Sequence, residues 1–302
     1  MKVARRRTGP GFGFVLRQPS PASCVRGAAR QTPCHNSSSL LRDAVVSIPH
    51  VPFTISHAAA ALPLRRLRKI RLPLAAVIIG SMSPDYAYFV PWGFESLETH
   101  SLFGLFAFCW PVSLALWVLF VRVLEPPTTA LLPEHWRTRF PPSDRDFSPR
   151  GLTVASAAVS LGAVTHVVWD SFTHGRTVVT EVFPALRDVA FHFGGWQFRW
   201  FFVLQLLSSV FGLAALAIWA WRQPPGRYPR PSVPESVSGR LRLRATAAII
   251  AGTVALAMAG YFGYADAHVK IRLFHFLIGG MTGALLAWCA VAVVVRRNAS
   301  LG

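Results

Sequence analysis

Long apolar runs separated by short polar connections fill most of the sequence from residue 101 onward. Five runs are long enough for membrane-spanning helices, because a helix needs about 20 apolar residues to cross a bilayer. Charged side chains are nearly absent inside them, and Trp and Tyr collect near their ends, as is typical of the membrane interface. The predicted spans are 101–121, 151–173, 200–221, 245–264 and 273–295.

A less regular helical region precedes these spans. Thr54 or Ser56 can cap a short N-terminal helix, and the alanine run that follows has high helix propensity. After an arginine-rich turn comes an apolar stretch at 72–92, which Pro84 and Asp85 interrupt. We expect 72–92 to cross or nearly cross the membrane, and a short helical hairpin or re-entrant element is the alternative. The predicted fold is an all-α integral membrane helical bundle with about six transmembrane helices plus the short N-terminal helix.

Residues 1–50 differ from the rest of the chain. They are rich in Gly, Pro, Ser and Arg, and they lack the apolar core of a secretory signal. This composition predicts a basic disordered tail. A second hypothesis is a mis-assigned start, because a bacterial chain can begin at a valine codon and Val51 lies just before P-F-T-I-S-H. In either case the predicted membrane domain is 51–302.

The composition is that of a membrane protein. Of 302 residues, 52% are apolar and 15% are charged, whereas about 25% is usual for soluble domains. The net charge of +18 comes almost entirely from arginine. The arginines lie between the apolar spans and not on one soluble face, so we interpret them as cytoplasmic loop residues that contact anionic lipid head groups. We expect no nucleic-acid partner.

The positions of Lys and Arg predict an orientation. With 72–92 as the first span, alternate connections carry 18 basic residues on one side and five on the other. The positive-inside rule then places 65–71 and the C-terminus in the cytoplasm. The connections 93–100, 174–199 and 265–271 would face outward. We therefore expect a multi-pass protein of the inner (plasma) membrane.

The densest polar group inside a span is T-H-V-V-W-D-S-F-T-H-G at 165–175. His166, Asp170 and His174 are each four residues apart, so a helix places them on one face. A carboxylate between two imidazoles is costly within a membrane unless something binds there. The pattern therefore predicts a binding site at the outer end of the span, although His174 could instead cap the helix before Gly175.

Polar residues at the same predicted depth in other segments strengthen this hypothesis. Imidazole and carboxylate ligands together favour zinc, manganese or iron over calcium. We predict a divalent metal, zinc or manganese in the first place, that turns a bound water into a nucleophile. The candidate metal ligands are His57, Asp85, His100, His166 and Asp170.

Other interpretations of these residues remain open. Asp85 could belong only to a turn, and His100 only to a helix start that Thr99 caps. His57 reaches the outer cluster only if the 57–83 hairpin enters from outside. Among the remaining polar residues, His275 is a spare ligand, His192 is expected in solvent, and Gln205, Ser208 and Ser209 are interpreted as helix-packing residues.

The order of the motifs P-F-T-I-S-H-A-A-A-A-L-P-L, I-I-G-S-M-S-P-D-Y, T-H-S-L-F-G-L and T-H-V-V-W-D-S-F-T-H-G resembles an uncharacterised family of bacterial multi-pass membrane proteins. The layout is more distantly similar to the inner-membrane metal-dependent hydrolases. That second resemblance implies a metal-binding role for His57, Asp85, His100, His166 and Asp170.

Three positions depart from the hydrolase pattern. Ala87 stands where the pattern has a second acid, Tyr88 where it has the adjacent histidine, and Glu95 where it has the first histidine of H-R-G-x-T-H-S. A two-metal centre is therefore in doubt, and Glu95 or His174 would substitute as an additional ligand or a general base in a single-metal site.

Three functions follow from these patterns. The first is a metal-dependent hydrolase with an outward-facing site that acts on phosphoesters or lipid head groups. The second is a transporter or proton relay that uses the pair His166 and Asp170. The third is a non-catalytic membrane scaffold in which the polar cluster only fixes helix packing. The sequence names neither the substrate nor the oligomeric state.

Overall fold

The structure is a computed structural model that describes residues 54–64, 72–89, 96–194, 196–230 and 237–299. All of these residues lie in one compact unit, Ile48–Gly302. The predicted basic tail and the Val51 start fall outside the described residues and stay predictions.

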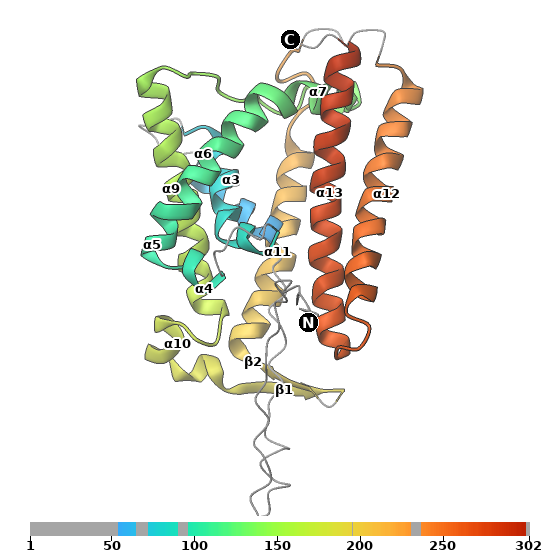
Figure 1. Cartoon of the computed structure of the whole chain (residues 1–302). Coiled ribbons are helices and arrows are strands. Elements are labelled where there is room, and N and C mark those ends of the chain that lie inside the picture. Colours follow the sequence, from blue (N-terminus) through green and yellow to red (C-terminus); the bar gives the residue numbers. More distant parts are fainter. Residues whose placement is uncertain (1–53, 65–71, 90–95, 195, 231–236, 300–302) are drawn as a thin grey trace, which may run out of the picture. The chain divides into compact units, whose positions relative to one another are not determined.

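Long helices make up the described part of the chain (Figure 1), and five of them are long and apolar enough to cross a membrane. This confirms the prediction of an all-α membrane bundle. Two of the spans are composite, and the helix α11 begins at the residue where the apolar pattern places it. The five candidate spans are Leu102–Leu131, Pro149–Val182, Trp200–Arg222 (α11), Gly239–Gly263 (α12) and Ile271–Arg297, which lies within α13 (Val269–Ala299).

The first span changes its helical pitch twice. Its two π-helical turns, η3 (Leu105–Cys109) and η4 (Phe120–Leu124), each come directly before an α-helical segment with proline in its first turn. Proline lacks the N–H that a regular helix would donate, so it fits best where a new segment begins. The α-helical segments of this span are α5 (Leu102–Gly104), α6 (Trp110–Leu119) and α7 (Glu125–Leu131).

The predicted span at 72–92 is not one continuous helix. It contains the nine-residue helix α3 (Leu74–Met82), which passes into the 3₁₀-helix η2 (Ser83–Tyr88) where Pro84 follows. Neither piece has the length of a full span. The N-terminal helix is likewise short, with the 3₁₀-helix η1 (Thr54–Ala60) followed by α2 (Ala61–Leu64).

These short elements form a hairpin whose two ends lie at the same level. The Thr54 hydroxyl at its start donates to the Asp85 carboxylate at its end, at 2.7 Å. At the other end of the hairpin, Leu64 and Leu72 pack against an apolar cluster of buried residues. Leu152, near the start of α9, packs against the same cluster. The chain therefore enters the hairpin from the Asp85 end and returns to it, which corresponds to the alternative expected for 72–92.

The helix α9 (Pro149–Thr173) packs closely against α3 (Figure 1). The two backbones approach at a pair of glycines. A Cβ on Gly80 would lie 2.1 Å from the Val159 carbonyl oxygen, and one on Gly162 would lie 2.3 Å from that of Val77. Small residues allow this close approach between membrane helices. The contact fixes α3 along the half of α9 that leads to His166.

The helices α12 and α13 form an antiparallel pair that lies side by side in Figure 1. Glycines on both helices again allow close packing, as at Gly283, where a Cβ would lie 2.3 Å from the Gly252 carbonyl oxygen. The pair contacts the first span through Trp288, whose indole N–H donates to the Thr128 hydroxyl at 2.8 Å.

The connection between α9 and α11 contains structure that the sequence patterns did not predict. A short helix α10 (Val178–Val182) and a 3₁₀ turn η5 (Pro184–Arg187) precede two antiparallel strands, β1 (Val189–Phe193) and β2 (Trp196–Arg199). Phe191 stacks on Phe198 across the strands, with ring centroids 4.7 Å apart. The remaining described helices are α4 (Ser96–Thr99) and α8 (Glu134–Arg137).

Candidate metal centre

Four of the predicted ligands converge at one end of the bundle. Asp85 comes from η2, His100 from the turn after α4, and His166 and Asp170 from successive turns of α9. One ligand atom of each residue lies within 4.8 Å of the ligand atoms of the other three. Three separate segments of the chain thus bring two imidazoles and two carboxylates to one point.

The four distances between an imidazole nitrogen and a carboxylate oxygen in this group are close to those of a tetrahedral metal site. His166 Nε2 lies 3.2 Å from Asp170 Oδ2 and 3.6 Å from Asp85 Oδ1. His100 Nε2 lies 3.3 Å from the same Asp170 oxygen and 3.8 Å from the same Asp85 oxygen. Ligands bound at zinc distances in a tetrahedron stand about 3.3 Å apart. The four side chains therefore need little movement to hold an ion.

His166 is oriented by a backbone contact with the neighbouring helix. Its Nδ1 lies 2.7 Å from the Ser81 carbonyl oxygen, which can only accept, so Nδ1 carries the proton. In neutral imidazole the other nitrogen is then an acceptor, yet it is buried without a hydrogen-bond partner and faces two carboxylates. Either a proton on this nitrogen or a metal cation between these groups removes the repulsion. A histidine held by a carbonyl on one nitrogen with a metal on the other is a common arrangement.

Asp170 lies at the centre of the cluster and contacts four imidazoles. Besides His100 and His166, its carboxylate lies 3.5 Å from His57 Nε2 and 3.6 Å from His174 Nδ1. His57 approaches Oδ1, whereas the other three histidines approach Oδ2. His57 is therefore beside the group of four and not part of it.

His57 reaches this position because its hairpin begins at the Asp85 end. Its ring stacks on that of His166 with centroids 3.8 Å apart and an interplanar angle of 18°. Burial, followed by the neighbouring His166, lowers the pKa of His57 to about 4. The imidazole is therefore neutral near pH 7, the form in which histidine binds a metal.

Three threonine hydroxyls hold the backbone and carboxylates around the cluster. Thr54 donates to Asp85 Oδ2 at 2.7 Å, which leaves Oδ1 facing the histidines. Thr99 donates to the Pro84 carbonyl oxygen at 2.7 Å and so fixes η2 beside His100. Thr173 lies 3.5 Å from Asp170 Oδ1. Hydrogen bonds of this kind set the orientation of metal ligands.

Two of the alternatives from the sequence can now be compared with the structure. Thr99 does not cap the helix after His100, because Ser101 takes that place and accepts from the Gly104 N–H. His174 does cap α9, through its N–H bond to the Asp170 carbonyl oxygen, and its side chain also lies beside the Asp170 carboxylate. His174 therefore ends the helix and lies beside the cluster, and its role in the site stays a prediction.

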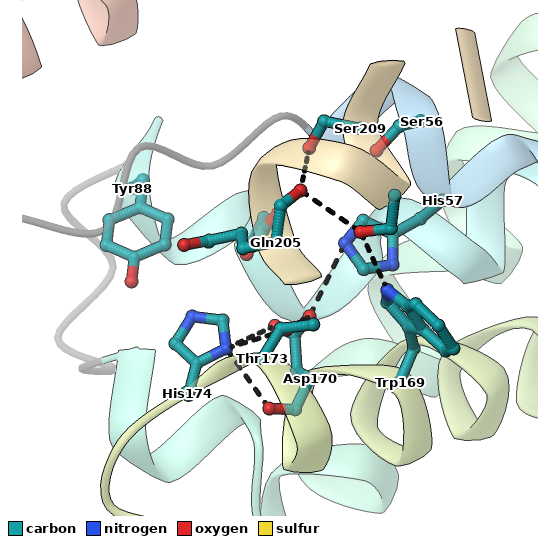
Figure 2. A pocket seen from close by; sticks show the side chains of 11 residues that line it. Ser56, His57, Tyr88, Trp169, Asp170, Thr173, His174, Gln205 and Ser209 are labelled. Atoms are coloured by element: carbon teal, nitrogen blue, oxygen red, sulfur yellow. Dashed lines mark hydrogen bonds and ion pairs between the residues drawn. The ribbon is translucent and has the colours of Figure 1, made fainter. Parts of the chain in front are cut away.

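A small cavity adjoins the cluster between η1, η2, α9 and α11 (Figure 2). Its volume is about 20 Å³, which exceeds the roughly 10–15 Å³ that one water needs. The wall on α11 consists of Gln205, Ser208 and Ser209. Their sequence pattern predicts packing residues, and only their proximity to α9 in the fold shows that they line the cavity.

The remaining predicted site residues do not join the cluster in the described part of the chain. Glu95 lies outside the described residues, so its predicted role is untested. The spare ligand His275 instead stacks on Tyr264 with ring centroids 3.5 Å apart. His192 is exposed on β1, as expected.

Comparison with known proteins identifies a family to which no activity is assigned. A family model described as "Domain of unknown function (DUF4184)" matches residues 51–293. No curated protein and no solved structure matches the chain. The distant similarity to metal-dependent hydrolases therefore depends on the sequence motifs alone.

Proposed function

The chain belongs to this family of unknown function, and we propose that it is a membrane-embedded, metal-dependent hydrolase. The observation that carries the proposal is the convergence of Asp85, His100, His166 and Asp170, whose ligand atoms lie within 4.8 Å of one another. Uncompensated carboxylates and imidazoles are expensive inside a membrane protein and usually mark a functional site.

Two imidazoles and two carboxylates favour zinc or manganese as the ion. A divalent ion in this position supplies Lewis-acid activation of a water or of a phosphoryl oxygen. The protein's own contribution is orientation. Ser81 fixes the tautomer of His166, and Thr54 turns one oxygen of Asp85 toward the histidines. His57 serves as an additional neutral ligand or as a support for the Asp170 carboxylate.

We assign the general base to His174. It lines the cavity, and its ring is more accessible than that of His166, with side-chain exposures of 26% and 0%. A base must reach the attacking water from the solvent side of the ion. Glu95 remains the second candidate for this role.

The surroundings of the cavity favour an amphiphilic substrate, a phosphoester or lipid head group. Large apolar side chains on α9 and α11 near the cavity are exposed, among them Val168, Phe172, Leu207 and Val210. In a membrane-spanning helix such side chains face lipid. A lipid head group can thus reach the cavity while its chains remain among these residues.

A proton relay through the bundle has less support. Below His166, the buried residues of α9 that pack toward α3 and α6 are Ala155, Ala158, Val159 and Ala163. A relay needs titratable or hydrated groups along its path. These four positions of α9 offer none.

The inner (plasma) membrane location, the cytoplasmic placement of the arginine-rich connections and their contact with anionic lipids are part of the proposal. The basic residues Arg139, Arg145, Arg227 and Arg230 lie in or around these connections, at the end of the bundle away from the metal centre. This location supports the orientation expected from the positive-inside rule.

Metal removal tests the proposal. Protein purified in nanodiscs is expected to hold about one equivalent of zinc or manganese, because the four ligand atoms match one ion. Stripping the metal with a chelator should abolish release of phosphate or head group from phospholipids, and the ion should restore it. His275→Ala, which removes a histidine outside the cluster, is the control and should retain the metal. Protein with well under one equivalent and chelator-resistant activity would contradict the proposal.

The role of His174 has its own test. His174→Ala is expected to lower kcat about 100-fold, the usual range for loss of a general base. Its metal content should stay at the wild-type value, because His174 is not among the four converging ligands. Loss of metal together with activity would instead make His174 a ligand. Elemental analysis and initial rates on the same preparation separate the two outcomes.

A further inference from the structure

The side-chain oxygen of Gln205 is an unpaired polar atom in the wall of the cavity. The residue is 9% exposed, and its Oε1 is buried without a hydrogen-bond partner. Burying such a group without a hydrogen bond is costly, so the cavity that it lines has to supply a donor. Figure 2 shows the side chain extending from α11 toward Tyr88 and His174.

The neighbouring hydroxyls are already engaged elsewhere. Both Ser208 and Ser209 donate to the Gln205 backbone carbonyl oxygen, at 3.0 and 2.7 Å. Ser208 also accepts from the Trp169 indole N–H at 3.1 Å. Together these bonds fix α11 against α9 and hold Gln205 in position. None of them involves the side-chain oxygen of Gln205. The donor that pairs with Oε1 therefore comes from the cavity, either from a water or from a ligand group that displaces it.

We propose that Gln205 determines substrate specificity by accepting a hydrogen bond from a hydroxyl or amine in the alcohol part of a phosphoester. The inference rests on the proposed function, because the phosphoester group is assigned to the metal centre across the same cavity. Asp170 and Gln205 both line this space, one from α9 and the other from α11. The hydroxyl or amine occupies the cavity itself, toward Gln205, because the cavity holds a group of about the size of one water. The phosphoester lies at the edge of the cavity, toward Asp170.

This arrangement discriminates between head groups. Glycerol and ethanolamine carry O–H or N–H donors, whereas the quaternary ammonium of choline has none. A ligand without a donor leaves the buried oxygen unpaired, and a site built around a hydrogen bond rejects such analogues. Gln205 therefore selects phosphoesters of glycerol or ethanolamine over those of choline.

The test compares glycerol 3-phosphate with phosphocholine, whose alcohol part has no O–H or N–H donor, as soluble probes of the metal-loaded protein. Wild type is expected to bind the first about tenfold more tightly, the effect of one hydrogen bond. Gln205→Met keeps the length of the side chain and removes its polar atoms, so the ratio of the two affinities should fall to near one. Saturation-transfer NMR or calorimetry measures the two affinities.

Gln223→Met is the matched control. Gln223 has the same exposure as Gln205, 9%, and lies directly after α11, at its opposite end. Its amide is already paired with the Trp219 carbonyl oxygen. This variant should retain the tenfold preference. A preference that survives in Gln205→Met, or that falls equally in Gln223→Met, would overturn the inference.

Nanodiscs of phosphatidylglycerol or phosphatidylcholine provide a second arm that identifies the source of the ligand. A preference for glycerol over choline that is seen only in nanodiscs points to a lipid head group. The same preference seen only with the soluble probes points to a free phosphoester. Absence of selection in both arms would overturn the inference. Metal content is measured separately on every variant. Selection by chelated protein that shows no metal-dependent hydrolysis would keep the inference and reject the proposed hydrolase.

Discussion

Asp170→Asn is expected to abolish metal binding. The carboxylate contacts four imidazoles, and its Oδ2 lies 3.2 Å from His166 and 3.3 Å from His100. The neutral amide removes the charge that balances an ion. Loss of a supporting residue alone weakens metal binding about 10- to 100-fold, so loss of this ligand should exceed about 100-fold. Elemental analysis and metal titration of purified protein measure the change.

The same variant distinguishes a metal centre from a scaffold. In wild type, added metal should raise the apparent Tm, because ligand binding to the folded state stabilises it. This rise should disappear in Asp170→Asn. If the cluster only fixed helix packing, the variant would lower Tm equally with and without metal. The control is Asp146→Asn. The Asp146 carboxylate accepts from the Ser148 N–H in the loop before α9, and this variant should keep the metal-dependent rise in Tm.

Gly162→Ala is expected to be among the most destabilising substitutions outside the cluster. The added Cβ would lie 2.3 Å from the Val77 carbonyl oxygen and 2.6 Å from the Ser81 N–H nitrogen. Backbone atoms cannot move aside without shifting α3. Overpacking typically costs about 1–3 kcal/mol and occasionally more, and we expect the upper end, about 3 kcal/mol. Equilibrium unfolding in mixed micelles measures the loss.

A shift of α3 should also weaken metal binding, although Gly162 contacts no ligand atom. Ser81 would move away from His166, and η2 would carry Asp85 with it. Gly263→Ala is the control, because a Cβ there meets nothing within 4 Å. Wild-type stability and metal content in Gly162→Ala would show that the helices can separate without affecting the site.

Much of the fold follows from the lengths of the apolar runs. The described α11 matches its run to within one residue, Trp200–Arg222 against the predicted 200–221. The stretch at 72–92 was harder to predict, because its apolar content is that of a span while Pro84 and the 3₁₀ turn shorten the α-helix. The strands β1 and β2 are short and lie in a polar connection, where no periodicity distinguishes them.

The candidate site could be predicted in part for a similar reason. The spacing of His166 and Asp170 already places both side chains on one helix face. The partners from other segments could only be inferred from their shared depth. The Ser81 carbonyl and the Thr54 hydroxyl carry no signal in the sequence, because their roles depend on how α3 and η1 pack. Gln205 and its serines looked like packing residues for the same reason.

The hairpin that begins and ends beside Asp85 has a consequence for experiments with fusion reporters. It returns the chain to the face where it entered, and an odd number of candidate spans, five, follows. The end of α13 is accordingly on the face opposite the metal ligands, beside the first span, where Arg296 bonds the Arg122 carbonyl oxygen. A phosphatase or fluorescent tag after residue 299 would report the compartment on the side opposite the His/Asp cluster. A tag within the β1–β2 turn would report the compartment on the side of the cluster.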